Sequence, residues 1–287
     1  MTDRLPLNEL PAHSEWARYL LAEDRDPPSE PETYIRRETY DDMYTRLYER
    51  HGGQAAPPRR IVEEIRSGDP DTTHVVSRKE TLSVVDPTEL VRREYRTVRA
   101  ALDPIVEPGD TVYDLGCGWG WTLDAIASAF PDVRVVGGEP VAAGVDFARD
   151  LVADRDRISV HQFDLLGDWE LFDGADADGI LFTKGVLITL PDLEPVRNQV
   201  SELVAAGTLK AGVHLEQTGP HPETVLGYLR RRYSRERGYR TDVLEGLRST
   251  STIEVTDVSY DVHGKNPLHP LTRIRWDGRT ARPAVTR

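Results

Sequence analysis

Three glycines at alternate positions, Gly116, Gly118 and Gly120, form the stretch of this sequence best suited to binding a ligand. A short apolar run, 112–115, precedes them, and the apolar residues after them repeat at i, i+3, i+4 and i+7, which is typical of a helix with one buried face. Because glycine has no side chain, a ligand can approach the backbone of the turn and the N-terminus of that helix. The pattern predicts a nucleotide-binding loop; the alternative is an ordinary glycine turn that binds nothing.

The spacing of these glycines distinguishes the loop from two other nucleotide-binding patterns. A dinucleotide fingerprint has the spacing G-x-G-x-x-G and a phosphate-binding loop ends in G-K-S or G-K-T, and this loop has neither. The run D-L-G-C-G-W-G, residues 114–120, resembles motif I of the class I S-adenosylmethionine-dependent methyltransferases. The resemblance covers about residues 87–277 and implies S-adenosylmethionine as cofactor. It assigns five loop residues to cofactor binding: Asp114, Gly116, Cys117, Gly118 and Gly120.

Two acidic residues follow at the ends of the next two predicted strands. Glu139 follows the apolar strand that starts at Val133, and a carboxylate there can accept hydrogen bonds from both hydroxyls of a ribose. The resemblance implies that Asp164 accepts a hydrogen bond from the adenine amino group while Phe163 or Leu165 stacks on the ring. The alternatives are that Glu139 only favours the dipole of the following helix and that Asp164 is a surface-turn residue.

The fourth predicted strand, 179–183, ends where the resemblance places the transferred methyl group, and its last residue, Thr183, is assigned to cofactor binding. An oxygen acceptor of high pKa would also need a base. Three residues at strand ends are candidates to supply or orient that base: Lys184, His214 and Glu216.

The residues after this strand argue against two activities, the methylation of amino groups in nucleic acids and the methylation of cytosine carbon. Enzymes that methylate amino groups of nucleic acids carry an acidic residue or Asn followed by Pro-Pro and an aromatic residue, whereas this chain has T-K-G-V. Methylation of a cytosine carbon needs a nucleophilic cysteine, and the only cysteine, Cys117, lies in the glycine loop.

The alternation of strands and helices from residue 87 onward predicts an α/β fold, a doubly wound, seven-stranded Rossmann-like sheet. Two final strands, 253–262 and 271–276, are expected to form a closing antiparallel hairpin, which dehydrogenase sheets lack. We therefore divide the chain into an N-terminal helical cap or lid, 1–86, and a methyltransferase domain, 87–287. Residues 1 to about 85 show no strand pattern and are predicted to be helices joined by loops.

An aromatic stripe marks one helix of this cap. Its members fall at i, i+3, i+4, i+7 and i+8 and are Tyr40, Met43, Tyr44, Leu47 and Tyr48. We assign Tyr40 and Tyr44 to substrate binding, since caps of small-molecule methyltransferases often cover the cofactor. The alternative is that the stripe only packs against the main domain.

An arginine cluster on the segment after the fifth strand opposes the acidic character of the chain: Arg230, Arg231, Arg232, Arg235, Arg237 and Arg240. Val225, Leu229 and Tyr233 can bury one side of this helix. Arg231 and Arg235 share another side, where they could clamp a carboxylate or phosphate of the acceptor. The alternative is a solvated face with salt bridges.

Composition narrows the remaining possibilities. The 287 residues carry 49 acidic and 36 basic side chains, a net charge of −13, and only four of the basic residues are lysine. Such a surface resembles proteins of halophilic archaea, although a GC-rich genome would also favour arginine. Nucleic-acid binding is not expected, because it needs a basic footprint. Without an apolar span or signal peptide the protein is expected to be cytoplasmic, and one cysteine excludes an internal disulfide and a multi-cysteine metal site, so we predict no metal.

The function predicted from these residues is S-adenosylmethionine-dependent methyl transfer to a small polar acceptor, most simply an oxygen of a sugar or of another hydroxylated or carboxylated metabolite. The alternatives are a protein methyltransferase and a non-catalytic S-adenosylmethionine-binding protein. The sequence does not specify the acceptor or the oligomeric state.

Overall fold

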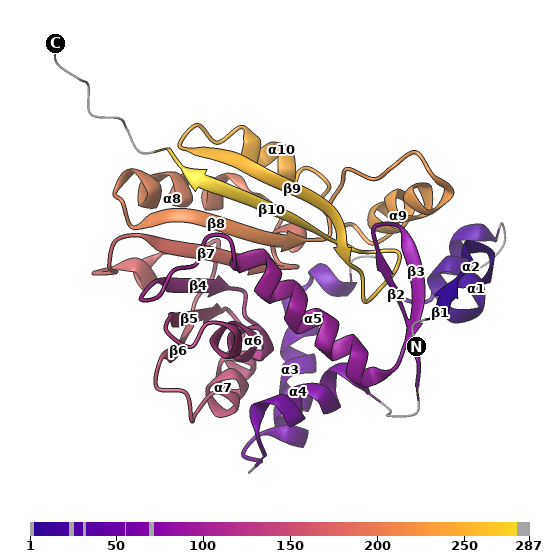
Figure 1. Ribbon diagram of the computed structural model, residues 1–287, viewed down its shortest axis with the longest axis horizontal. Helices are drawn as coiled ribbons and strands as arrows, with labels where there is room; N and C mark the ends of the chain where they lie inside the picture. The colour runs from indigo at the N-terminus through magenta and orange to yellow at the C-terminus, as the bar shows by residue number, and fades with distance from the viewer. Residues whose placement is uncertain (1–2, 23–25, 31–32, 55, 69–71, 280–287) are drawn as a thin grey trace.

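A seven-stranded sheet organises the computed structural model, which describes residues 3–22, 26–30, 33–54, 56–68 and 72–279 (Figure 1). Across the sheet the strands are β6 (Ile158–Gln162), β5 (Arg134–Glu139), β4 (Thr111–Leu115), β7 (Gly179–Lys184), β8 (Leu209–Glu216), β10 (Leu271–Gly278) and β9 (Ile253–His263). The first five are parallel, whereas β10 is antiparallel to both of its neighbours. The predicted doubly wound sheet with a closing antiparallel hairpin is confirmed.

Two apolar cores cover the two faces of this sheet. The flanking helices are α5 (Pro87–Leu102), α6 (Trp121–Ala129), α7 (Ala142–Leu151), α8 (Glu194–Ala205) and α10 (Val243–Arg248). Val112 of β4 packs in the core with α5, α6 and α7, whereas its neighbour Tyr113 packs in the core with α8 and α10. Successive side chains of a strand point to opposite faces, so β4, which has a core on each face, is buried at every position.

The N-terminal segment contains a second sheet that the sequence does not predict. Its antiparallel strands lie in the order β1 (Asp3–Leu5), β3 (Thr81–Val85) and β2 (His74–Arg78). The prediction that residues 1 to 85 contain only helices and loops was therefore wrong. Lys79 and Glu80 turn the β2–β3 hairpin with φ values of 48° and 60°. Asn and Gly favour this left-handed turn, and because neither occurs here the hairpin has no local sequence signal.

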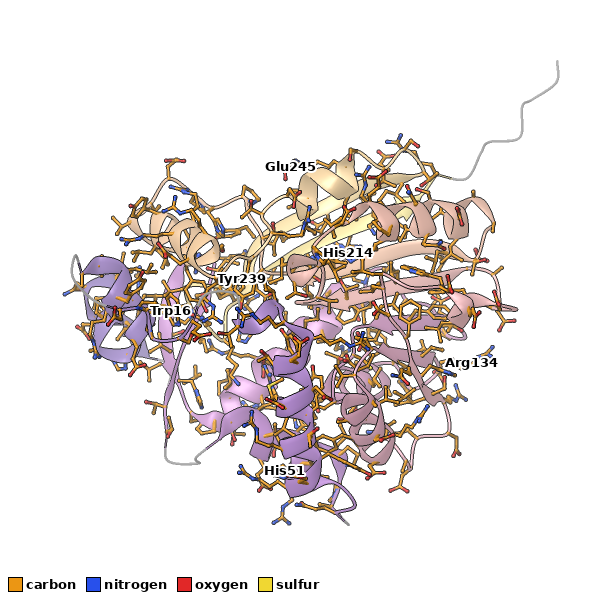
Figure 2. All side chains as sticks on the ribbon, turned by 180° about the vertical axis from the view of Figure 1, so that it is seen from behind. Trp16, His51, Arg134, His214, Tyr239 and Glu245 are labelled. Atoms are coloured by element: carbon orange, nitrogen blue, oxygen red, sulfur yellow. The ribbon has the colours of Figure 1, made fainter. Side chains whose placement is uncertain are left out.

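The remaining α-helices are α1 (Leu10–His13), α2 (Glu15–Leu21), α3 (Arg37–His51), α4 (Pro58–Ser67) and α9 (Val225–Glu236). Short 3-10 helices span Leu7–Glu9, Thr33–Ile35, Glu170–Phe172 and Leu187–Thr189. α3 packs against α7 and α4 against α5, so Tyr44 and Ile61 share the core of the α5 face. α2 packs against α9 instead. Figure 2 shows α3 from the other side of the molecule, with His51 at its C-terminal end. In the described part of the chain, no helix combines the length and the apolar character that crossing a membrane requires.

A fully buried ion pair joins the N-terminal hairpin to α9 and β9. Nη2 of Arg230 lies 3.0 Å from Oδ2 of Asp261, and both side chains are 0% exposed. Arg230 also donates to the carbonyl of Pro267 at 2.8 Å. Asp261 accepts from the Ser77 hydroxyl at 2.8 Å and from the Glu80 amide at 2.7 Å, which holds the hairpin turn in place. Arg230 is therefore a structural residue of the arginine cluster.

We expect Arg230→Met to destabilise the fold by about 3–5 kcal/mol, because the buried Asp261 carboxylate would lose its compensating charge. Arg235→Met on the same helix is the matched control: this side chain is exposed, so its loss should change the free energy of unfolding by less than about 0.5 kcal/mol. Denaturant unfolding of both variants measures the difference, and equal stabilities would contradict a structural role for the buried pair.

Candidate active site

A cavity of about 500 Å³ lies at the carboxyl ends of β4, β5 and β7. The strand order reverses at β4: the chain continues to β5 and β6 on one side of β4 and then returns to β7 on its other side. Open α/β sheets bind ligands at such a switch point. The candidate groups meet the cavity in the order of the strands: Asp164 after β6, Glu139 at the end of β5, the glycine loop after β4 and Lys184 at the end of β7. Four strands span roughly 14 Å at ~4.8 Å spacing, enough for an extended nucleoside-like ligand.

The glycine loop can form only with glycine at its three alternate positions. Gly116, Gly118 and Gly120 have φ values of 78°, 57° and 91°, which side-chain-bearing residues rarely adopt. A Cβ on Gly118 would lie 2.7 Å from the Tyr44 hydroxyl, and one on Gly120 would lie 2.9 Å from Cα of Ala148. Gly116 and Gly118 line the cavity, whereas Gly120 permits the packing of α6 against α7 and does not line it. This corrects the assignment of Gly120 to cofactor contact.

Glu139 braces the glycine loop and faces the cavity. Its Oε2 accepts a hydrogen bond from the Gly118 amide at 2.9 Å and its Oε1 accepts from the Val141 amide at 3.1 Å. Burial raises the pKa of Glu139 to about 7, although both amides favour the carboxylate. A carboxylate oxygen has two acceptor positions, so each can also receive a hydroxyl donor from a ligand.

Asp164 and its neighbours form the wall next to Glu139. Phe163, Asp164 and Leu165 all line the cavity, and the two apolar side chains are buried. Oδ1 of Asp164 accepts from the Leu166 amide at 3.0 Å, and Oδ2 lies 3.1 Å from Nη1 of Arg37. The residues assigned to a ring and its amino group are therefore placed together at this wall.

Asp114 and Cys117 lie at the base of the loop. Asp114 is 1% exposed and does not line the cavity, but it accepts a hydrogen bond from the hydroxyl of Thr122, which does. Its Oδ1 is buried with no hydrogen-bond partner in the described part of the chain, and burial raises the pKa of Asp114 to about 7. Cys117 lines the cavity, and burial raises the pKa of its thiol, so the thiol stays protonated.

Three predicted residues lie behind the cavity wall. The Thr183 hydroxyl donates to Oε1 of Glu216 at 2.7 Å and accepts from Nδ1 of His214 at 2.9 Å, while Nε2 of His214 accepts from Nε1 of Trp276 at 2.8 Å. Burial lowers the pKa of His214 to about 3. His214 is 2% exposed, and Figure 2 labels it in the region of the main sheet. None of the three lines the cavity, because inward positions of β7 and β8 place them in the core.

This network corrects the assignments of Thr183, His214 and Glu216 to cofactor and base. Glu216 also accepts hydrogen bonds from the amides of Val186 at 3.3 Å and Ile188 at 3.4 Å. The buried network therefore orders the segment after β7, whose residues line the cavity, and touches no ligand itself.

Lys184 is the predicted basic residue that does line the cavity. Its Nζ lies 4.9 Å from the centre of the Trp121 ring, and no salt bridge to it is found among the described residues. Burial and the nearby Arg66 lower the pKa of Lys184 to about 8. Lys184 can therefore exchange a proton close to physiological pH.

Arg66 is a cavity residue that sequence reasoning missed. It comes from the last turn of α4, and Glu94 of α5 holds it through two hydrogen bonds, with Nε to Oε2 at 2.9 Å and Nη2 to Oε1. Arg66 lowers the pKa of the buried Glu94 to about 2 against the effect of burial. The positive charge of Arg66 is thus fixed beside Trp121, 4.9 Å from the centre of its ring.

α3 forms one wall of the cavity, and Arg37 connects this helix to the loops that follow β5 and β6. Tyr40, Met43 and Tyr44 of the aromatic stripe line the cavity, and Tyr44 is buried. Besides the ion pair with Asp164, Arg37 donates to the carbonyl of Pro140. An arginine at the start of a helix opposes the helix dipole, which is a sequence signal that Arg37 is placed for another purpose. Tyr40 and Tyr44 pack against the core of the main domain and also line the cavity. Packing and a position at the cavity are therefore not exclusive alternatives for these residues.

Arg231 and Arg235 do not reach the cavity. Nη1 of Arg231 donates to the carbonyls of His221 at 3.1 Å and Pro222 at 3.2 Å, and Arg235 is exposed. Neither lines the cavity, because α9 packs against α2 rather than over the strand ends. This corrects their assignment to the acceptor.

Comparison with known proteins identifies the central part of the chain. Residues 112–207 match a methyltransferase domain family, and no curated protein sequence matches the chain. The match spans the glycine loop, Glu139, Asp164 and Lys184, which are the residues that meet the cavity. The chain therefore contains a methyltransferase domain.

Several solved methyltransferase structures are similar to this chain at low sequence identity. A magnesium protoporphyrin IX methyltransferase from Synechocystis PCC 6803 with bound SAH has a TM-score of 0.50 and 14% identity, over 84% of this chain and 97% of that one. A geranyl diphosphate C-methyltransferase from Streptomyces coelicolor A3(2) has a TM-score of 0.47 and 14% identity, over 78% and 100%. The N-methyltransferase NodS from Bradyrhizobium japonicum WM9 has a TM-score of 0.48 and 15% identity, over 67% and 88%.

The residues that line the cavity are suited to bind S-adenosylmethionine. The glycine loop exposes backbone to the cavity, Glu139 presents acceptors at the next strand, and Asp164 with Phe163 and Leu165 offers an acceptor and apolar surface beyond it. The sequence predicts the ribose at Glu139 and the adenine at Asp164, and both residues line this cavity, as do the glycine loop and Lys184.

We expect Glu139→Gln to weaken S-adenosylmethionine binding by about 1.5–3 kcal/mol, the range for a hydrogen bond to a charged group. The corresponding loss is roughly 10- to 150-fold in Kd. Titration calorimetry measures it. Glu245→Gln on the surface of α10 is the control with the same chemical change, and it should bind as the parent protein does. Equal affinities of the two variants would contradict the assignment of Glu139 to the ribose.

Proposed function

We propose that this methyltransferase transfers a methyl group to a hydroxyl oxygen of a small polar acceptor. The observation that carries the proposal is a cavity lined by Lys184 and Arg66 on the β7 side of the glycine loop. A lysine with a pKa near 8 is suited to removing a proton from a hydroxyl group, and a fixed guanidinium is suited to holding an anionic or strongly polar part of the same molecule.

The size of the cavity supports a small acceptor. Small-molecule sites have volumes of about 300–1,000 Å³, and the 500 Å³ here must hold the donor as well. α3 covers the opening with Tyr40 and Tyr44, and the ion pair of Arg37 holds α3 against Asp164. A cavity of this volume is in the range of small-molecule sites, which favours an acceptor of sugar size over a folded protein.

The chain's residues have separate roles in the proposed reaction. Bound S-adenosylmethionine supplies a methyl group already activated on a sulfonium sulfur. Neutral Lys184 accepts the hydroxyl proton as the acceptor oxygen bonds to the methyl carbon and the carbon–sulfur bond breaks toward sulfur. Arg66 keeps its proton, because its two hydrogen bonds with Glu94 stabilise the charged form, and it orients the acceptor. α3 and Trp121 exclude water from the reacting atoms.

The experiment that tests the proposal supplies the protein with methyl-labelled S-adenosylmethionine and an extract separated into small molecules and macromolecules. We expect label in the small-molecule fraction. Label only in protein would favour the alternative of a protein methyltransferase, and absence of transfer together with tight donor binding would favour a non-catalytic binding protein.

The rate of methyl transfer should rise with pH through about 8, because Lys184 must be neutral to accept a proton and its lowered pKa places the change there. Lys184→Met should reduce kcat by about 10²–10⁴-fold and remove the inflection, since a positioned general base contributes about that much. Lys184→Arg should not restore activity, because a guanidinium stays protonated.

Lys265→Met is the matched control for the pH profile. Burial lowers the pKa of Lys265 to about 8 as well, but this side chain donates to the Arg66 carbonyl and does not line the cavity. The inflection should therefore persist in this variant. If the profile keeps its inflection in Lys184→Met and loses it in Lys265→Met, the titrating group is Lys265. That result would overturn Lys184 as the proposed base.

A further inference from the structure

A second cavity, of about 820 Å³, lies away from the glycine loop. The β2–β3 hairpin, α5 and the ends of β8, β9 and β10 surround it, and none of its lining residues lines the first cavity. Figure 1 shows α5 crossing in front of the sheet, with the hairpin and β9 beside it. Methyl transfer as proposed above uses no residue of this second cavity.

The second cavity concentrates positive charge in a chain of net charge −13. One carboxylate, Glu89, lines it together with five cationic side chains: Arg78, Lys79, Arg93, Arg96 and Arg273. Three of these cations, Arg78, Lys79 and Arg96, have no salt bridge within the described residues. Clustered like charges repel one another, so this arrangement lowers stability unless an anion compensates it.

Two of the cations are already held in position. Nε of Arg93 lies 3.0 Å from Oε1 of Glu89, and Nη1 of Arg93 donates to the Ser83 hydroxyl at 3.4 Å. Nε of Arg273 lies 2.9 Å from Oδ2 of Asp257, and its Nη2 donates to the Ser259 hydroxyl at 2.9 Å. Guanidinium groups fixed in this way lose little conformational entropy when they bind an oxyanion.

A buried polar atom in the cavity wall is an independent sign of a ligand. His263 is only 3% exposed and lines the second cavity, and its Nε2 has no hydrogen-bond partner in the described part of the chain. Burial lowers the pKa of His263 to about 4, so the ring is neutral near pH 7. Buried polar groups in native proteins are rarely left without a partner.

We propose that the second cavity binds a small organic molecule that carries two or more phosphate groups. Each phosphate contributes about −1.5 to −2 charges near pH 7, so two of them match the three cations that have no salt bridge within the described residues. Arginine forks fit phosphate oxygens bidentately. Leu215, Val262 and the Tyr260 ring also line the cavity, which gives the organic part of the ligand an apolar surface.

The binding experiment uses the full-length protein at low salt, with inorganic tripolyphosphate and ATP as probes in titration calorimetry. We expect both to bind, and ATP to bind more tightly if the apolar surface holds the organic part. Arg78→Ala combined with Arg96→Ala should raise the Kd of both probes at least tenfold. Both side chains are exposed, so the double variant should fold, and S-adenosylmethionine should bind it as it binds the parent protein.

Arg99→Ala is the matched control, since Arg99 is an exposed arginine of the same helix that lies outside the second cavity. It should leave the Kd of both probes unchanged. The proposal fails if neither probe binds, if the double variant binds as tightly as Arg99→Ala, or if S-adenosylmethionine displaces the probes, because they would then occupy the first cavity. It also fails if a single-stranded RNA oligomer binds more tightly than ATP, which would indicate an open polyanion surface. None of these outcomes depends on the identity of the methyl acceptor.

Discussion

One buried carboxylate, Glu94, balances the positive charges that lie between the two cavities. It sits on the inner side of α5, 2% exposed, and binds the Arg66 guanidinium through both of its oxygens. The charge of Glu94 also opposes the lowering of the pKa of Lys184 and of His263 by burial, and these two residues line the first and the second cavity respectively. Without Glu94, the repulsion between Arg66 and Lys184 would be uncompensated in a medium where charges are weakly screened. The acceptor end of the methyltransferase site therefore depends on this helix, which precedes the methyltransferase domain match.

The N-terminal segment and the main sheet form one structure through such polar contacts as well as through apolar packing. Arg37 connects α3 to Asp164, Arg66 connects α4 to Glu94, and Asp261 connects the β2–β3 hairpin to α9. Tyr44 fills the space beside Gly118 that a larger residue would need. Closure over the cofactor and the shape of the glycine loop are thus coupled, because the same tyrosine contacts the loop and belongs to the helix that covers it.

Features that arise from local sequence patterns could be predicted. Features that depend on how distant segments of the chain pack against each other could not. The alternating strands and helices from residue 87 onward, the closing hairpin and the loop around Gly118 follow from apolar periodicity and glycine spacing. Periodicity does not show that Lys184 points into the cavity while His214 points into the core, because that depends on the register of neighbouring strands. Nor could it reveal Arg37 and Arg66, which reach the site only because α3 and α4 pack on α7 and α5. The β2–β3 hairpin was missed because its turn has neither Asn nor Gly.

Two cavities lined by cations in an acidic protein imply that ligands are selected by their size as well as by their charge. Charges separated by more than about 8 Å are largely screened at physiological ionic strength, so a small anion inside a cavity interacts mainly with the cations around it. A long polyanion also meets the acidic surface outside, where the net charge of −13 repels it. The same arginines that would attract nucleic acid on an open face can therefore serve compact anions here. The position of Lys184 and Arg66 inside a cavity of about 500 Å³ adds a steric preference for compact ligands to this electrostatic one.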